Sequence, residues 1–283
     1  MRASTVVVAA ASVLLAACRA PPPAEKERDD AGYRAALSEG DGAFARRGDP
    51  SRLAEALLAY RRAAAERPGE PEPEIRLARA EAFRALAAGE APAAREGWTA
   101  SARAAERALR TLSPAWAEAI DAGSGAAEAA GRVEAAGAEA LYWLGLGTLR
   151  AAQAVGYAAL LSAKDSVLPT LERSAELDEG LDAAGAHRAL GALRAALPVA
   201  AGGGAASAQA HFGRARALFP REQLSRVLQA ETLAVLLQDG EAFDRLLAEV
   251  AAFDPAAWPE REPENAVARE RARALAARRA RLF

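Results

Sequence analysis

The sequence predicts an all-α protein, and three observations support that fold class. Alanine, which has the highest intrinsic helix propensity, supplies 82 of the 283 residues. Aromatic residues make up only 5% of the chain, so a β-sandwich or barrel would lack its usual side chains. From residue 31 onward, helix-length segments of about 15 to 22 residues alternate with Gly, Pro or Asp punctuation. This alternation predicts a series of helical hairpins.

Residues 1–17 predict a secretory signal peptide. A short positive start precedes a small apolar segment, which is too short for a membrane-spanning helix of about 20 apolar residues. The segment ends in Leu-Ala-Ala-Cys, which resembles the bacterial lipobox and implies that Cys18 becomes the lipid-bearing first residue of the mature protein. An ordinary free or buried thiol is the alternative. Because Cys18 is the one cysteine, no disulfide can form within the chain.

Residues 18–30 are expected to form the lipidated cysteine and a flexible tether. Three prolines at 21–23 are followed by a charge run that contains no core-forming side chain. If extended at about 3.1 Å per residue, this tether reaches on the order of 35 Å from the membrane. Residues 31–283 then form one helical domain that is held at a membrane by its lipid anchor alone.

A spacing of four, three and five residues recurs in three predicted second helices of hairpins. The first two steps place apolar side chains on one helical stripe, and a proline five residues later ends the helix. The sets are Ala56, Tyr60, Ala63 and Pro68; Ala208, Phe212, Ala215 and Pro220; and Phe243, Leu247, Val250 and Pro255. Two predicted first helices share another spacing, in Trp143, Leu146 and Gly147 and in His187, Leu190 and Gly191.

These spacings resemble the tetratricopeptide repeat, which has W-x-x-L-G in its first helix and A-x-x-x-F-x-x-A followed by proline in its second. The resemblance implies an irregular tetratricopeptide-like solenoid of helical hairpins, in which small residues let paired helices approach closely. Residues 81–112 fit the template poorly, and the Gly- and Ala-rich segment 123–137 interrupts the regular stacking.

A longer series of motifs resembles the T-component family of tripartite ATP-independent periplasmic (TRAP) transporters. The motifs are Ala140-Leu141-Tyr142-Trp143, residues 184–191, residues 208–215, Glu264-Asn265-Ala266 and the terminal Leu282-Phe283. The resemblance implies a periplasmic lipoprotein that assembles as a homotrimer. It also implies a helper subunit, not an enzyme, that partners the periplasmic substrate-binding protein of the transporter. Because Arg19 and not Asp follows Cys18, we expect the anchor in the outer membrane.

In repeats of this type, the first helix of each hairpin lines a groove at fixed positions relative to its packing aromatic. The positions are Leu141, Leu144, Thr148, Ala151 and Ala152 when counted from Trp143, and Gly185, Arg188, Ala192, Ala195 and Ala196 when counted from His187. Such an apolar groove suits an apolar or amphiphilic carboxylate that Arg188 would orient. Two alternatives stay open: Arg188 can pair with Asp182, and His187 can bridge a hairpin instead of contacting a ligand.

Several kinds of chemistry lack sequence support. The two histidines, His187 and His211, have no cysteines or acidic residues at zinc-site spacing, so no metal is expected. The Gly-Leu-Gly at 145–147 lacks the last glycine of a dinucleotide loop, and no Gly-x-Ser-x-Gly elbow occurs. Carboxylates accompany arginines at helical spacing, as in Glu81 with Arg84, which is typical of a solvated face. We therefore expect neither a cofactor nor enzymatic activity.

The last predicted helix, residues 265–283, carries six arginines and one acidic residue. Val267, Ala274, Leu275 and Leu282 fall on one face, which favours an amphipathic cap over docking to a partner or to anionic headgroups. The net charge of −2 excludes the basicity of a general nucleic-acid binder. The alternative function is a structural repeat lipoprotein that scaffolds an envelope protein assembly without a small-molecule groove.

Overall fold

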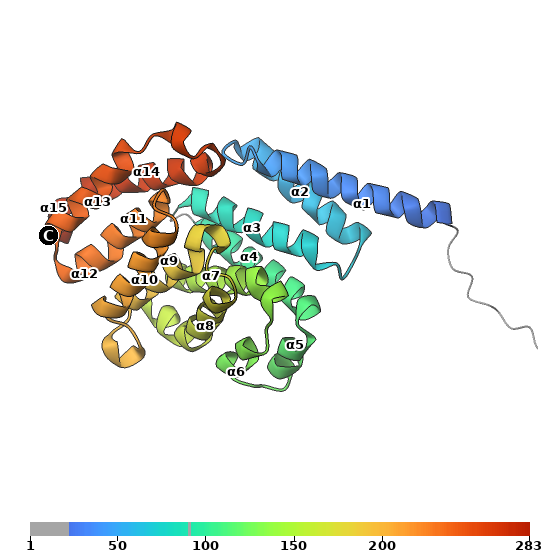
Figure 1. The fold of residues 1–283 in the computed structure, drawn as a ribbon, viewed down its shortest axis with the longest axis horizontal. Helices are drawn as coiled ribbons and strands as arrows, with labels where there is room; N and C mark the ends of the chain where they lie inside the picture. Colours follow the sequence, from blue (N-terminus) through green and yellow to red (C-terminus); the bar gives the residue numbers. More distant parts are fainter. Residues whose placement is uncertain (1–22, 90–91) are drawn as a thin grey trace, which may run out of the picture.

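The computed structural model of the protein describes residues 23–89 and 92–283, and all regular secondary structure within them is helical (Figure 1). The predicted all-α fold class is therefore confirmed. The predicted signal peptide, Cys18 and the start of the predicted tether lie outside the described residues. Among the described helices, none is both long and apolar enough to span a bilayer.

Antiparallel hairpins follow one another along the described chain. Each of the first four pairs two α-helices, and in the fifth the first arm is a continuous helix with a π-helical turn in its middle. The pairs are α1 (Pro23–Phe44) with α2 (Pro50–Glu66), α3 (Pro71–Ala88) with α4 (Pro92–Leu112), α7 (Ala138–Val155) with α8 (Tyr157–Leu177), α9 (Leu181–Ala196) with α10 (Ala205–Leu218), and α11 (Gln223–Gln229), η3 (Ala230–Ala234) and α12 (Val235–Leu237) with α13 (Gly240–Ala252).

The remaining helices are short insertions and a C-terminal cap. The helices α5 and α6 form an irregular excursion between two hairpins and pack around Trp116 in a separate apolar cluster. The predicted interruption at 123–137 covers α6 but not α5, which precedes it. The bounds are α5 (Pro114–Asp121), α6 (Ala126–Gly131), α14 (Glu262–Ala277) and α15 (Arg279–Leu282), with 3₁₀ turns η1 (Ala135–Gly137), η2 (Val199–Ala201), η4 (Pro255–Ala257) and η5 (Pro259–Arg261).

The helix ends follow from local sequence. The side chain of Asp49 caps α2 by accepting a hydrogen bond from the backbone N–H of Ser51 at 2.8 Å, and Pro50 occupies the first turn. At the other end, α2, α10 and α13 stop before Pro68, Pro220 and Pro255, as their recurring spacing predicted.

The start of α1 corrects one expectation. The helix begins at Pro23, so the second part of the predicted tether is helical, not extended. Proline is well tolerated in the first helical turn, and the Ala-Glu-Lys-Glu-Arg run that follows it contains good helix formers. The boundary of the folded domain at residue 31 stays a prediction.

Close approach between paired helices depends on a glycine in the first helix of three hairpins. A Cβ atom at Gly145 would lie 2.8 Å from Cδ2 of Leu171, inside normal contact distance. The facing pairs are Gly40 with Tyr60, Gly145 with Leu171, and Gly191 with Phe212. Tyr60, Leu171 and Phe212 are fully buried. The glycine therefore leaves room for one large side chain that fills the centre of each hairpin.

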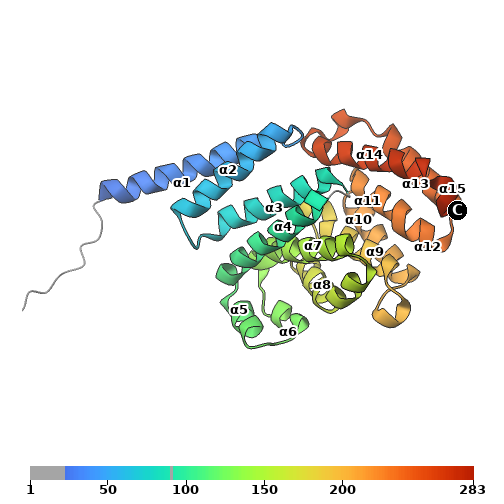
Figure 2. The same cartoon turned by 180° about the vertical axis from the view of Figure 1, so that it is seen from behind.

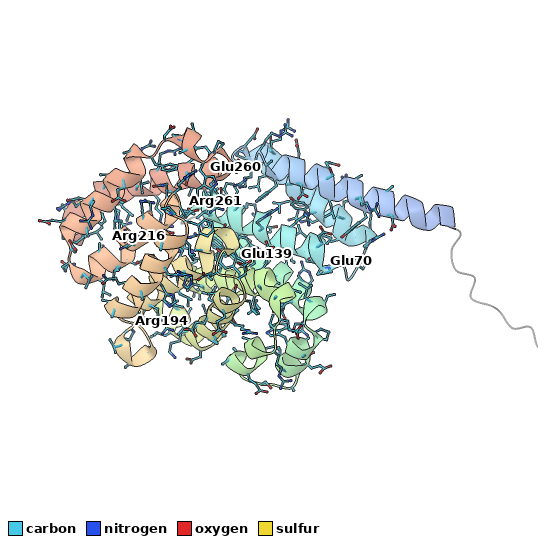
Figure 3. The ribbon with its side chains drawn as sticks, viewed as in Figure 1. Glu70, Glu139, Arg194, Arg216, Glu260 and Arg261 are labelled. Atoms are coloured by element: carbon cyan, nitrogen blue, oxygen red, sulfur yellow. The ribbon has the colours of Figure 1, made fainter. Side chains whose placement is uncertain are left out.

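The two ends of the hairpin series meet. The turn between α1 and α2 lies beside the start of α14 in both views of the molecule, and α14 also contacts α3 (Figures 1 and 2). Pro263 lies against Gly48 in this junction. Figure 3 labels Glu260 and Arg261 at the same junction. The hairpins thus close into a ring, so that the side chains of the first helices face a common centre.

The C-terminal helix packs as a cap on the last hairpin. Ala268, Ala272 and Leu275 of α14 are buried in one cluster with Phe243 and Leu246 of α13. Ala274, which the sequence assigned to the apolar face, is exposed, because the buried stripe follows Ala268 by steps of four and three residues. Three of the six arginines of the last predicted helix form ion pairs: Arg269 with Glu262, Arg271 with Glu231, and Arg279 with Asp244.

Candidate functional site: a cavity inside the ring

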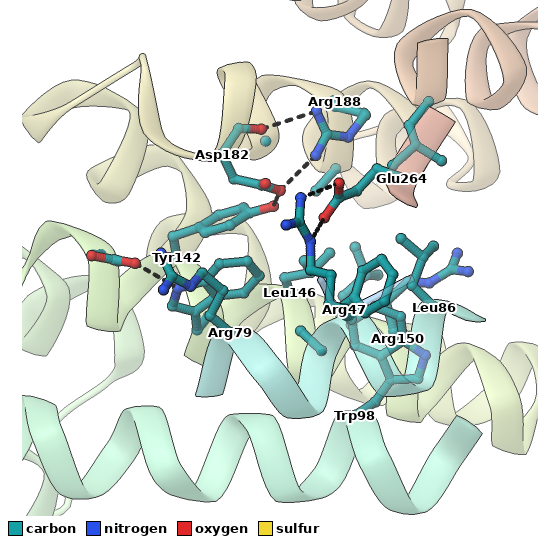
Figure 4. Close-up of a pocket in the computed structure, with 18 of the residues that line it drawn as sticks. Arg47, Arg79, Leu86, Trp98, Tyr142, Leu146, Arg150, Asp182, Arg188 and Glu264 are labelled. Atoms are coloured by element: carbon teal, nitrogen blue, oxygen red, sulfur yellow. Dashed lines mark hydrogen bonds and ion pairs between the residues drawn. The ribbon is translucent and has the colours of Figure 1, made fainter. Parts of the chain in front are cut away.

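A cavity of about 680 Å³ lies at the centre of the ring (Figure 4). Its wall comes mainly from the first helix of each hairpin, α1, α3, α7, α9 and α11, and from the C-terminal residues around η5 and α14. Of the second helices, α4 alone contributes, through Trp98. A volume of this size is in the range of ligand pockets, roughly 300–1,000 Å³.

The residue that follows each helix-packing glycine lines this cavity. These residues are Asp41 after Gly40, Leu146 after Gly145, and Ala192 after Gly191. Because the glycine faces the second helix, the next residue is rotated by about 100° toward the inside of the ring. The positions three residues further on in α1 and α7, Phe44 and Leu149, lie on the same wall.

This register corrects the predicted lining of α7. Leu141, Leu144 and Thr148 do not line the cavity, and Leu141 is fully buried in the cluster around Trp116. The wall of α7 consists instead of Glu139, Tyr142, Trp143, Leu146, Leu149, Arg150 and Gln153. The predicted positions fall on another side of α7, and that side packs against neighbouring helices.

A two-residue offset explains the error. Leu-Gly occurs twice in α7, at 144–145 and at 146–147, and the predicted lining takes the second occurrence as the equivalent of Leu190-Gly191. In the structure Gly145 faces Leu171 of the hairpin partner α8, whereas a Cβ atom at Gly147 would lie 2.7 Å from the backbone oxygen of Trp98 in α4. Both glycines permit close packing, but only Gly145 sets the hairpin register.

Three of the five positions predicted in α9 lie on the cavity wall. Gly185, Arg188 and Ala192 all line the cavity. Ala195 and Ala196 do not. Whether any of these residues touches a ligand stays a prediction.

His187 points away from the cavity. Its Nδ1 lies 3.0 Å from Nδ1 of His211 in α10, and its Nε2 lies 3.6 Å from Oε2 of Glu179. This is the hairpin-bridging alternative that the sequence left open. Burial lowers the pKa of His187. Burial, together with His187 and Arg194, lowers the pKa of His211 to about 4. Two neutral imidazoles can share one hydrogen bond in this contact.

A left-handed turn opens α9 and shapes the polar wall of the cavity. The backbone φ angles of Asp182, Ala183 and Ala184 are 46°, 54° and 60°. Residues other than glycine rarely adopt this left-handed region. The turn aims the carbonyls of Asp182 and Ala183 at Nη1 of Arg188, at 3.2 Å and 3.1 Å. Next to it, Gly185 leaves the space that the hydroxyl of Tyr142 occupies.

The carboxylate of Asp182 joins three elements of the ring. Oδ2 accepts hydrogen bonds from the hydroxyl of Tyr142 at 2.6 Å and from Nη2 of Arg188 at 2.7 Å. Oδ1 accepts a hydrogen bond from Nη1 of Arg261 at 2.7 Å. Burial would raise the pKa of Asp182, but the charges of Arg261 and Arg188 outweigh it and lower that pKa to about 2. The alternative in which Arg188 pairs with Asp182 is therefore confirmed.

Arg261 and Arg47 bring the C-terminal end of the chain to this wall. Nη2 of Arg261 lies 2.9 Å from Oε2 of the fully buried Glu222. Nε of Arg47 donates to Oε1 of Glu264 at 2.8 Å, and Nη2 of Arg47 donates to the backbone oxygen of Glu260 at 2.7 Å. These bonds hold the polar wall together across the closure of the ring.

The opposite wall is apolar and aromatic. The rings of Phe44 and Phe83 meet edge to face with centroids 6.4 Å apart. The residues that complete this wall are Ile75, Ala82, Leu86, Trp98, Leu146 and Leu149. Figure 4 shows Leu146 between the Tyr142 end of the cavity and the end formed by Leu86 and Trp98. The cavity thus combines an apolar wall with a polar wall that carries several arginines, which suits a molecule with one charged end.

Many acidic side chains of the described residues form ion pairs with arginines, and they are not clustered as metal ligands. No group of three or more His, Cys, Asp or Glu side chains among them is placed to hold a metal ion. Glu81, which the sequence assigned to a solvated face, is buried, because α2 lies over it and Arg61 and Arg84 bind its two oxygens at 2.7 Å and 2.6 Å. Several cavity carboxylates are likewise bound by arginines.

Comparison with known protein families gives a match over most of the chain. The sequence model of the TRAP transporter T-component family matches residues 79–283, which include every helix from α4 to the C-terminus. No curated protein matches the chain. The match leaves out the α1–α2 hairpin, which supplies Asp41, Phe44 and Arg47 to the cavity.

Proposed function

The chain belongs to the TRAP transporter T-component family, and from this premise we propose that it docks the periplasmic substrate-binding protein of such a transporter and holds an apolar or amphiphilic carboxylate. The family match supports the accessory role in a TRAP transporter. The central cavity, with one apolar wall and one polar wall that carries several arginines, supports the proposed binding of such a ligand. The proposed role is binding without turnover.

To test docking, the protein is immobilised and used to capture binding partners from a periplasmic extract of the bacterium that produces it. We expect the substrate-binding protein of a TRAP transporter to be enriched relative to capture on an unrelated lipoprotein. Enrichment of envelope-assembly proteins without that binding protein would favour the scaffolding alternative. Purified binding protein then gives the affinity directly by calorimetry.

We also propose that Cys18 carries a lipid anchor and that the protein assembles as a homotrimer on the periplasmic side of the membrane. Labelled palmitate should appear on the mature protein and be absent from a Cys18→Ser variant. Native mass spectrometry of the detergent-solubilised protein should give the mass of three chains. Density-gradient fractionation decides between the outer membrane, which Arg19 favours, and the inner membrane.

A further inference from the structure

The arginines that line the cavity are not equivalent. Five of them form ion pairs with carboxylates within 4.0 Å: Arg47 with Glu264, Arg76 with Asp41 and Glu72, Arg188 with Asp182, Arg261 with Asp182 and Glu222, and Arg271 with Glu231. A sixth, Arg150, donates to Oε1 of Gln153 and lies over the ring of Trp98. The remaining one is Arg79.

Arg79 has no carboxylate oxygen within 4.0 Å among the described residues. Its Nε is buried and has no hydrogen-bond partner among them. The guanidinium lies over the ring of Phe44, 4.5 Å from the centroid. It also interacts with the hydroxyl of Tyr60, whose pKa burial and Asp41 nevertheless raise. Neither a phenyl ring nor a neutral hydroxyl compensates a full positive charge as an anion does.

Asp41, the acidic residue whose pKa the charge of Arg79 helps to lower, is bound by other donors. Oδ1 of Asp41 accepts hydrogen bonds from Nε of Arg76 and from the hydroxyl of Tyr60, both at 2.8 Å. Oδ2 accepts from Nη2 of Arg76 at 3.1 Å. These donors outweigh burial, which would raise the pKa of Asp41, and they lower it. Asp41 is therefore ionised and bound by Arg76, while Arg79 acts on it by charge alone and has no carboxylate oxygen within 4.0 Å among the described residues.

An apolar path leads away from Arg79 along the same helix. Arg79, Phe83 and Leu86 all line the cavity from α3, at steps of four and three residues. At 1.5 Å rise per residue, Leu86 lies about 10 Å along the helix axis from Arg79. Figure 4 shows Arg79 at the Tyr142 end of the cavity and Leu86 with Trp98 at the other.

We propose that Arg79 binds the carboxylate of a singly charged amphiphile whose apolar chain runs past Phe83 to Leu86 and Trp98. This inference rests on the proposed function. It adds the residue that binds the carboxylate and the direction in which the apolar chain runs. It also moves the anionic subsite away from Arg188, whose guanidinium is bound by Asp182 and by two backbone carbonyls. One unpaired guanidinium favours one negative charge, so dicarboxylates should bind less well than monocarboxylates.

Decanoate and decanol, which differ in the charged end and share the chain, test the assignment by calorimetry on the full chain. We expect wild-type protein to bind decanoate more tightly than decanol. Arg79→Gln should weaken decanoate binding by about 10- to 100-fold and leave decanol binding within about twofold, because a charge-assisted hydrogen bond is lost. Arg79→Lys should retain part of the preference. Arg84→Gln, on the same helix but outside the cavity, should bind both ligands as wild type does.

Each other outcome has a defined meaning. If Arg79→Gln binds decanoate as wild type does while decanol still enters the cavity, the Arg79 assignment is wrong and the proposed ligand function stands. Equal losses for decanoate and decanol would show that Arg79 only supports the fold, which circular dichroism of the same variant would report. If wild type binds neither probe, the assignment and the ligand part of the proposed function both fail.

Discussion

Arg47 and Glu264 lie 217 residues apart in the sequence, yet they form a two-bond ion pair in which each side chain is only 8% exposed. Arg47 belongs to the turn after α1, and Glu264 belongs to the first turn of α14. Together with the bond from Arg47 to the backbone of Glu260, the pair joins the first hairpin to the last helix. This contact closes a series of hairpins that would otherwise form an open arc.

The ring closure predicts a large effect of removing one partner. Glu264→Ala should lower the free energy of unfolding by about 3 kcal/mol or more, because it leaves the guanidinium of Arg47 buried without a counter-charge. Chemical denaturation measures this difference. Glu55→Ala, which breaks the exposed pair with Arg52, should change stability by less than about 1 kcal/mol. Similar losses of unfolding free energy in the two variants would contradict the role of the Arg47–Glu264 pair in closing the ring.

Two glycines of α1 provide a matched test of helix packing. A Cβ atom at Gly40 would overlap the ring of the fully buried Tyr60, whereas nothing lies within 4 Å of one at Gly42. Gly40→Ala should therefore destabilise the protein by about 1–3 kcal/mol. Gly42→Ala should be neutral or stabilise it by up to about 1 kcal/mol, because alanine is the better helix former. Thermal unfolding of the pair checks the sign, and equal effects would contradict the packing role.

The largely buried carboxylate of Asp182, 16% exposed, predicts a loss of stability in acid. Its pKa is about 2 in the folded protein and about 3.9 in an unfolded chain, so the folded state favours the ionised form. The resulting stabilisation is present above pH 4 and is lost as the pH falls through 2. Urea unfolding of wild type and Asp182→Asn at pH 5 and pH 2.5 isolates this contribution, roughly 2 kcal/mol, because other carboxylates titrate in both proteins. Parallel losses in the two proteins would contradict it.

The left-handed turn before Arg188 predicts that a glycine there stabilises the protein, although glycine usually destabilises a helix. Ala183→Gly should stabilise the protein by roughly 1 kcal/mol, since its φ of 54° strains alanine but not glycine. Ala186→Gly, three residues later in the right-handed part of α9, should destabilise it by about 1 kcal/mol or more. Destabilisation by both substitutions, measured by denaturation, would mean that the turn is not strained.

Much of the fold follows from short-range sequence patterns. The prolines at 68, 220 and 255 correctly predicted where three second helices end, because proline acts on the residue next to it. The buried stripes of those helices were also correct, since the steps of four and three select one helical face. Leu171 belongs to a fourth stripe, with Val167 and Ser174, which lacks a following proline and was missed.

The site was harder to predict, because its parts meet through distant contacts. The overlapping Leu-Gly pairs in α7 are equivalent in sequence, and only the packing of Gly145 on Leu171 selects the register. One local difference separates Arg76 from Arg79: Arg76 has Glu72 four residues before it, whereas Arg79 has no acidic residue three or four positions away. The second partner of Arg76, Asp41, lies in another hairpin and could not be predicted from local sequence. The long-range bonds of Asp182 to Tyr142 and Arg261 likewise depend on ring closure.

The most direct measurement is a crystal structure of the protein with a terminally brominated decanoate, located by the anomalous signal of bromine. The account predicts a bromine peak inside the ring beside Leu86 and Trp98, with the carboxylate at the guanidinium of Arg79. A bromine peak at Arg188 and Asp182, or binding only on the outer surface of the hairpins, would contradict the orientation and the site.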